Sequence, residues 1–130
     1  MNKNLVAFCF FLLAATIGLG AFGAHALKKL ADIEVQQSFE TAVRYQFYGT
    51  IILLTIAFRT EINGRMVRLW IRLFGLGMVL FSGSIYGLVL GKIIHLDWRF
   101  LGPITPIGGA LMILSLAMLG IHFVRNTREQ

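Results

Sequence analysis

Four long apolar blocks constrain this chain more than any other feature of its sequence. They run from Leu5 to Leu27, from about Thr41 to Phe58, from Met66 to Ile94 and from about Pro103 to Val124. Each block approaches or exceeds the about 20 residues that a helix needs to cross a hydrocarbon core. None alternates polar and apolar residues as a membrane barrel strand does, so helices are expected. The sequence therefore predicts an all-α fold, a four-transmembrane-helix bundle.

The composition agrees with a multi-pass membrane protein. Hydrophobic residues make up 57% of the 130 residues, charged residues make up 14%, and the mean hydropathy is +0.76. Soluble domains contain about 45–50% apolar residues. The first block is longer than the about 7 to 15 residues of a signal-peptide core, although Ala24-His25-Ala26 imitates a cleavage site. We interpret residues 1–130 as a single integral membrane domain.

The connection between the first two blocks has helical periodicity of its own. Its apolar residues recur at about helical spacing through residues 28–47, which predicts a short amphipathic interfacial helix between the first and second spans. Ser38 is expected to cap the continuation into the second span, with Glu40 in the first turn. Glu40 and Arg44 are spaced four apart, which predicts a local ion pair. Thr105 is expected to cap the fourth helix, with Pro106 in its first turn.

The charges predict the topology and the partners. The net charge is +6, and with four spans more Lys and Arg residues fall on the side of the termini than on the other side. By the positive-inside rule both termini are expected in the cytoplasm. Asn63-Gly64 predicts a tight turn between the second and third helices. The cations stand at helix ends and form no basic face, so membrane lipid is the expected partner and nucleic acid is not.

Polar side chains gather towards the outer ends of the predicted spans. Polar groups at membrane depth need partners or hydration, and an ionisable one suggests a functional site. Two interpretations stay open for them: a structural hydrogen-bonded cluster, or a site for a small molecule, a lipid head group or an anion. The serines can bond back to their own helix or across to a neighbour. The candidates are His25, Glu40, Arg44, Tyr45, Gln46, Ser82, Ser84, Tyr86 and Thr105.

Small residues predict the helix-packing faces. Without water to drive association, small side chains let helix backbones approach closely in a membrane. Three glycines of the third block repeat every four residues and form one stripe. The predicted packing glycines are Gly18, Gly23, Gly83, Gly87, Gly91, Gly108 and Gly109.

The sequence offers little for catalysis. No Asp or Glu stands near the middle of a span, which removes the usual carrier of a proton or cation relay. His25, His95 and His122 are far apart, so no metal site is expected, and Cys9 is the only cysteine. The glycines of "GLGAFG" follow no strand and do not indicate a nucleotide loop. We expect no enzyme activity and no cofactor.

Four blocks carry a resemblance to a known family. They are "LGAFGAHALKK" at 19–29, "FETAVRYQFY" at 39–48, "LFSGSIY" at 80–86 and "GPITPIGG" at 102–109. With these blocks in order, the chain resembles the YgdD-like family of small bacterial inner-membrane proteins, a domain-of-unknown-function family. The resemblance implies a four-helix integral membrane protein and no established activity. That family often has a histidine where this chain has Gly49, so an activity needing the histidine would be absent or altered here.

Two functions are predicted from these features. The first is a non-enzymatic membrane protein that acts through helix packing, as a homo-oligomer or as an accessory subunit of a larger membrane complex. The alternative is a binding or transport protein that uses the outer polar residues as its site.

Overall fold

Four long helices account for most of the chain. The computed structural model describes residues 1–59 and 64–127, and over these residues it contains helices and no strand. In chain order the elements are α1 (Lys3–His25), α2 (Leu27–Leu30), α3 (Ile33–Phe58), α4 (Arg65–Ile93), the 3-10 helix η1 (Arg99–Leu101) and α5 (Ile104–Thr127). The predicted all-α fold is confirmed over this part of the chain. The Asn63 half of the predicted turn lies outside the described residues, and Gly64 precedes α4 with φ at +145°.

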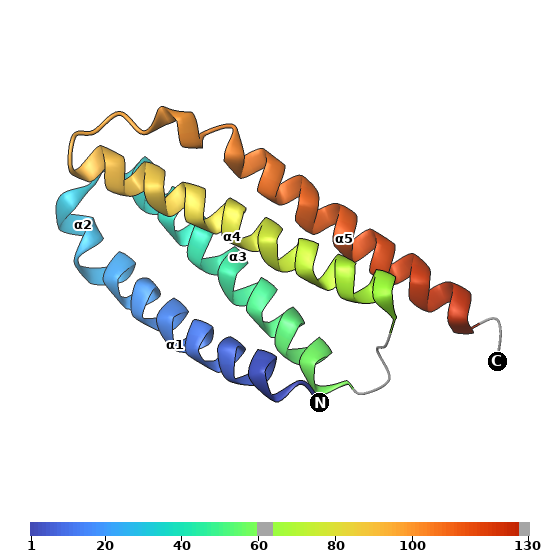
Figure 1. Cartoon of the computed structure of the whole chain (residues 1–130). Helices are drawn as coiled ribbons and strands as arrows, with labels where there is room; N and C mark the ends of the chain where they lie inside the picture. Colours follow the sequence, from blue (N-terminus) through green and yellow to red (C-terminus); the bar gives the residue numbers. More distant parts are fainter. Residues whose placement is uncertain (60–63, 128–130) are drawn as a thin grey trace.

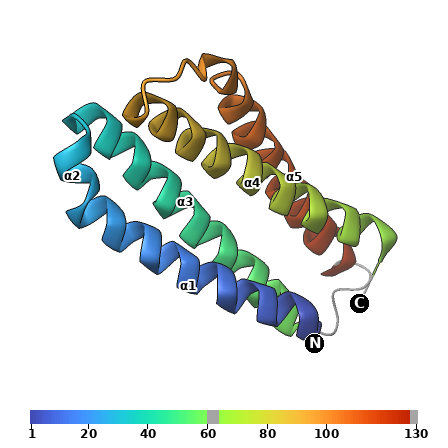
Figure 2. The same cartoon turned by 60° about the vertical axis from the view of Figure 1, so that its left-hand side comes forward.

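The long helices lie in an open row. α1 packs against α3, α3 against α4, and α4 against α5, so α1 and α5 form the two edges of the row (Figure 1). Neighbouring helices are antiparallel, and a second view shows the same order (Figure 2). The end of α1, the start of α3, the end of α4 and the start of α5 therefore meet at one end of the molecule.

Three helical segments of the described residues are long and apolar enough to cross a membrane. They are Lys3–His25, Arg65–Ile93 and the segment Arg99–Arg125 that contains α5. α3 is as long as these segments but is not among them, and its first half carries Glu34, Glu40 and Arg44. The structure thus supports three of the four predicted spans on length and hydropathy.

α3 starts earlier than the sequence predicts. Asp32 is its N-cap, and the Asp32 Oδ1 atom accepts a hydrogen bond of 3.0 Å from the Val35 N–H. Ser38 lies inside the helix and donates to the Glu34 carbonyl, so the prediction of a Ser38 cap is wrong. The reason is that no helix-breaking residue separates the amphipathic segment from the second apolar block. One continuous helix results, and only α2 remains as a separate short element.

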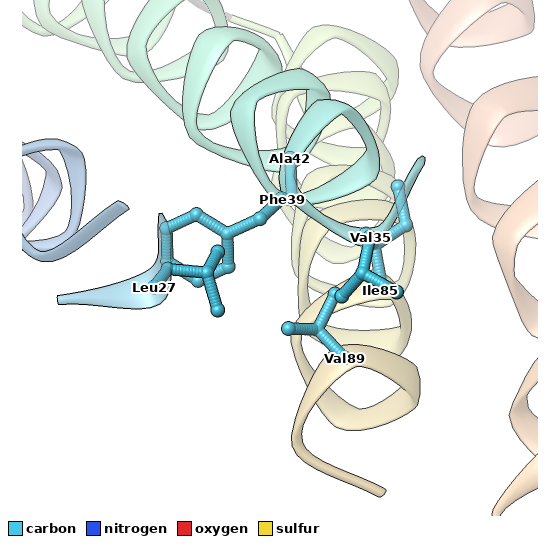
Figure 3. Packing of buried hydrophobic residues seen from close by; sticks show 6 residues of the cluster. All are labelled: Leu27, Val35, Phe39, Ala42, Ile85 and Val89. Atoms are coloured by element: carbon cyan, nitrogen blue, oxygen red, sulfur yellow. The ribbon is translucent and has the colours of Figure 1, made fainter. Parts of the chain in front are cut away.

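The first turns of α3 are buried against α2 and α4. Figure 3 shows the packed side chains, which come from α2, α3 and α4: Leu27, Val35, Phe39, Ala42, Ile85 and Val89. A second buried cluster lies further along the row and comprises Cys9, Leu53, Phe74, Met78 and Met112. The segment predicted to lie flat in the interface therefore contributes to the helix core.

α4 and α5 meet at two glycines. A Cβ atom built on Gly77 would lie 2.8 Å from the Gly108 carbonyl oxygen, and one built on Gly108 would lie 2.7 Å from the Gly77 carbonyl oxygen. Real Cβ atoms do not approach backbone atoms so closely, so only glycine fits at either position without a shift of the helices. α5 begins at Ile104, one residue before the expected cap, so the prediction that Thr105 caps it is wrong. Pro106 lies in the first turn, where an N–H is not required.

Candidate functional site

Gln46 is the centre of a buried hydrogen-bonded chain across three helices. Its Nε2 atom donates to Thr16 Oγ1 of α1 over 2.7 Å, and its Oε1 atom accepts from the Tyr86 hydroxyl of α4 over 2.9 Å. Thr16 donates in turn to the Leu12 carbonyl over 2.6 Å. Gln46 and Thr16 are buried, at 7% and 2% exposed. We call Thr16, Gln46 and Tyr86 the polar relay, and it joins α1, α3 and α4.

The two serines of α4 bond across to its neighbours. Ser82 Oγ donates to the Ala42 carbonyl of α3 over 2.9 Å. Ser84 Oγ donates to the Phe81 carbonyl of its own helix over 3.0 Å and lies 2.7 Å from Thr105 Oγ1 of α5. The sequence left open whether these serines bond to their own helix or to a neighbouring helix. Ser82 bonds to a neighbouring helix, and Ser84 does both. These bonds connect α4 to both of its neighbours in the row.

The charged candidates are not part of the polar relay. His25, Glu40 and Arg44 are exposed, and Tyr45 is 44% exposed. Glu40 and Arg44 line a groove of about 470 Å³ between α1 and α3. Within residues 1–59 and 64–127 the ion pair is formed by Asp97 and Arg99, so the prediction of a Glu40–Arg44 pair is wrong. Glu40 and Arg44 are one helical turn apart and share the exposed face of α3. Gln46 is only two residues from Arg44 and therefore points to the interior.

Asp97 and Arg99 form an exposed pair in the connection between α4 and α5. Arg99 Nε lies 3.0 Å from Asp97 Oδ1, and the Arg99 guanidinium also donates to Asp97 Oδ2. The side-chain hydrogen bond from Arg99 holds the pKa of the Asp97 carboxyl below its usual value. Any stability from this pair is present above the ordinary aspartate pKa and is lost as the pH falls through the lowered one. The pair is exposed, so it stabilises the fold little.

The predicted packing glycines have different surroundings. Gly23 packs under the Phe39 ring, 2.9 Å from a built Cβ, and Gly108 packs on α4, as predicted. Gly109 has ordinary contact distances to the Phe81 ring. A Cβ atom built on Gly87 would meet Leu101 of η1, and one built on Gly91 would lie 3.0 Å from the Leu96 carbonyl oxygen. Both glycines are therefore covered by the connection between α4 and α5 and not by a long helix. Gly18 and Gly83 have no atom within 4 Å of a built Cβ, so they face outwards.

The single-stripe prediction for α4 is therefore wrong. Gly83 is exposed and Gly87 and Gly91 lie under residues 96–101, while the glycine that contacts α5 is Gly77. Sequence reasoning missed Gly77, Thr16 and Thr50, which are all buried. The Thr50 hydroxyl donates to the Gln46 carbonyl over 2.6 Å. Thr16 stands among apolar residues, and nothing in its local sequence indicates a partner thirty positions away.

Gly49 packs against Met78 of the second buried cluster. It is buried, and a Cβ atom built on it would lie 3.1 Å from the Met78 Cγ and nearer still to its sulfur. Met78 thus fills the space that a side chain at position 49 would require. A side chain at position 49 therefore requires Met78 to move or to be replaced by a smaller residue.

The buried polar atoms are nearly all satisfied inside the protein. Among the described residues only Ser115 Oγ is buried without a hydrogen-bond partner. No group of three His, Cys, Asp or Glu residues in that part of the chain is placed to hold a metal ion. The polar relay can therefore fix the rotation and spacing of helices, since its donors and acceptors bond to each other.

These features define a helical membrane protein whose polar residues connect its helices. A family described as "Protein of unknown function (DUF423)" matches residues 19–109, and the chain belongs to it. The sequence is similar to the UPF0382 membrane protein SH2409 of Staphylococcus haemolyticus, at 47% identity over 80% of this chain and 81% of the relative. It is also similar to the UPF0382 membrane protein YwdK of Bacillus subtilis, at 36% identity over 84% and 86% of the two chains.

The family extends to a eukaryote. The UPF0382 membrane protein C1782.12c of Schizosaccharomyces pombe is 36% identical over 80% of this chain and 87% of its own. No solved structure matches the chain. The predicted membership of a membrane-protein family of unknown function is confirmed.

Proposed function

We propose that this protein is a non-enzymatic, four-span protein of the bacterial inner membrane that acts by packing its first helix against another membrane helix. The partner is a second copy of the chain or a subunit of a larger complex. The observation that carries this proposal is the outward small-residue face of α1, described next. Both termini are proposed to lie in the cytoplasm, as the distribution of Lys and Arg favours.

The outward face of α1 is built for close helix approach. Cys9, Thr16 and Gly23 are the buried residues of this helix and lie on one side of it. Ala14, Gly18 and Ala21 are exposed and lie on the opposite side, by the periodicity of 3.6 residues per turn. Ala14 and Gly18 form a small-xxx-small pair, the pattern that permits backbone contact between membrane helices. Since α1 is an edge of the row, this face meets no other helix within residues 1–59 and 64–127.

α3 is proposed as the fourth span. Its second half is apolar, and its first half buries Val35, Phe39 and Ala42 against other helices. It lies between α1 and α4 in the row, which are both apolar and long enough to span. A helix between two spans can carry polar groups such as Gln46, because neighbouring helices supply their partners.

The alternative function, binding or transport at the outer polar residues, is less favoured by the geometry. Gln46, Ser82, Ser84, Tyr86 and Thr105 bond to protein groups. His25 and Arg44 are exposed and are not part of these hydrogen bonds. A ligand at this cluster would have to replace bonds that already hold the helices together.

The test is the size of the native assembly and its response to one bulky substitution. The full chain is extracted with its surrounding lipid, and the mass is measured by native mass spectrometry and sizing. We expect a dimer or a reproducible heteromeric complex for the wild type. Gly18→Leu should weaken it about tenfold or more, because an added side chain separates backbones that must touch.

Gly120→Leu is the matched control. Gly120 also has no atom within 4 Å of a built Cβ, but it lies on α5 at the other edge of the row. Neither substitution meets the rest of its own chain, so both variants should fold. A monomeric wild type with no reproducible partner would contradict the proposal, and so would equal weakening by Gly18→Leu and Gly120→Leu.

A further inference from the structure

A second cleft lies at one end of the molecule, away from the polar relay and from Ser82 and Ser84. It is formed where the start of α1, the end of α3 and the start of α4 meet, and its volume is about 610 Å³. None of the polar candidates predicted from the sequence lines it. The cleft is thus a separate feature of the fold.

The mouth of the cleft is cationic. Arg59 follows the last turn of α3, and Arg68 and Arg72 come from the first two turns of α4. Arg68 and Arg72 are four residues apart, so their side chains leave the same side of the helix. All three are exposed, and no carboxylate among the described residues pairs with them. Among the described residues that line the cleft there is no Asp or Glu.

The walls of the cleft are apolar. Leu53 and Ala57 of α3 are 3% and 2% exposed, and Leu5, Phe8 and Ile71 complete the walls. Phe8 keeps 52% of its surface exposed, so the wall continues onto the outer surface of α1. The lining of the cleft is therefore cationic at the mouth and apolar along the walls.

One hydrogen bond ties two walls of the cleft together, and a second caps α1. The Asn2 N–H donates to the Ala57 carbonyl over 3.0 Å, which fixes the start of α1 to the end of α3. The Asn2 side chain caps α1 by accepting from the Leu5 N–H over 3.2 Å. The cleft is consequently preformed between two helices tied at their ends.

We propose that this cleft binds one anionic phospholipid, with its phosphate on Arg68, Arg72 and Arg59 and an acyl chain along the apolar walls. Guanidinium groups bind phosphate through paired N–H donors, and basic pockets between membrane helices recognise anionic head groups. A free phosphate would use only the arginines. The apolar walls beside them favour a ligand that carries a phosphate and a hydrocarbon chain together. The cleft is distinct from the outward face of α1, so this inference does not depend on helix association.

The test compares three probes on the full-length protein in detergent. Native mass spectrometry measures binding of dioleoyl phosphatidylglycerol, dioleoyl phosphatidylcholine and inorganic phosphate. We expect phosphatidylglycerol to bind at least tenfold more tightly than phosphatidylcholine. Arg68→Gln combined with Arg72→Gln should reduce phosphatidylglycerol binding about tenfold or more, since the two substitutions remove two of the three guanidinium groups that would hold the phosphate.

The charge controls remove the same number of cations elsewhere. Lys28→Gln combined with Lys29→Gln changes two exposed lysines of α2 at the other end of the row and should leave binding unchanged. Arg65→Gln is the single control for Arg72→Gln, because Arg65 is exposed on the same helix but does not line the cleft. If the variant with both Arg68→Gln and Arg72→Gln does not fold, the comparison of Arg72→Gln with Arg65→Gln decides the question, together with the preference of the wild type between the two lipids.

Gly75→Leu tests the hydrocarbon half of the ligand without changing charge. Gly75 lines the cleft, and a Cβ atom there has only an ordinary contact of 3.9 Å with Leu53. The added side chain should reduce phosphatidylglycerol binding several-fold and leave phosphate binding unaffected. Equal binding of the two lipids would overturn the proposal, as would an equal effect of the arginine and lysine double variants. Tight phosphate binding with no effect of Gly75→Leu on either probe would indicate a soluble anion instead.

Discussion

Gly108→Ala is expected to destabilise the protein by about 2 to 3 kcal/mol, near the upper end of the range for overpacking a close contact. The added methyl group would fall on the Phe81 backbone nitrogen and lie 2.7 Å from the Gly77 carbonyl oxygen. Backbone atoms of two helices cannot rotate away as a side chain can, so α5 must move off α4. This loss outweighs the about 1 kcal/mol that alanine gains over glycine in a helix.

Gly109→Ala is the control at the adjacent position. Its Cβ atom would contact the Phe81 ring at 3.5 Å, which is an ordinary distance. Only the helix-propensity gain applies there, so this variant should be as stable as the wild type or slightly more stable. The measurement is the free energy of unfolding in mixed micelles titrated with SDS, followed by the fluorescence of Trp70 and Trp98.

The partner glycine provides a second check. Gly77→Ala alone should have an effect similar to that of Gly108→Ala, since its Cβ would lie 2.9 Å from the Met112 nitrogen. Once one methyl group has separated the helices, the second meets less resistance. The double variant should therefore be less destabilised than the sum of the two. Equal stability of Gly108→Ala and Gly109→Ala would show that the two helices do not touch at this point.

The helices themselves follow closely from the sequence, whereas their rotation does not. The blocks predicted for the first and third spans agree with α1 and α4 within about two residues at either end. A soluble helix shows its buried side by a polar side opposite to it. α1 is apolar on every side, so no pattern distinguishes the side of Thr16 from the side of Gly18. Only the packing of α3 against it separates the buried glycine from the outward one.

The candidate polar site illustrates the same limit. Gln46 and Tyr86 were predicted to lie at one end of the row and they bond to each other. Arg44 was grouped with them because it is only two residues from Gln46, but residues two apart on a helix point in different directions. Thr16 could not be predicted, because a threonine in an apolar helix most often bonds only to its own backbone. Depth in the membrane can be predicted from sequence position, while contacts require the mutual orientation of helices.

Gln46→Leu should destabilise the protein by about 1 to 2 kcal/mol. The substitution removes both interhelical bonds of the glutamine and leaves the Tyr86 hydroxyl without its acceptor. Interhelical hydrogen bonds in membranes are worth on average about 0.6 kcal/mol each, and an orphaned buried polar group adds to the loss. Tyr86→Phe alone should have a smaller effect, about 0.6 kcal/mol, because it removes one bond.

A double-mutant cycle separates this hydrogen bond from general packing. If the Tyr86 hydroxyl stabilises the fold through Gln46, then Tyr86→Phe should cause no further loss of stability in the Gln46→Leu background. It should recover part of the loss, because the hydroxyl removed there has already lost its acceptor. Thr55→Val is the control, since the Thr55 hydroxyl is exposed and bonds only to the Ile51 carbonyl of its own helix. Its effect should be small and additive with Gln46→Leu. Additive effects of Gln46→Leu and Tyr86→Phe would mean that the two side chains act independently, and the polar relay would then not join α3 to α4.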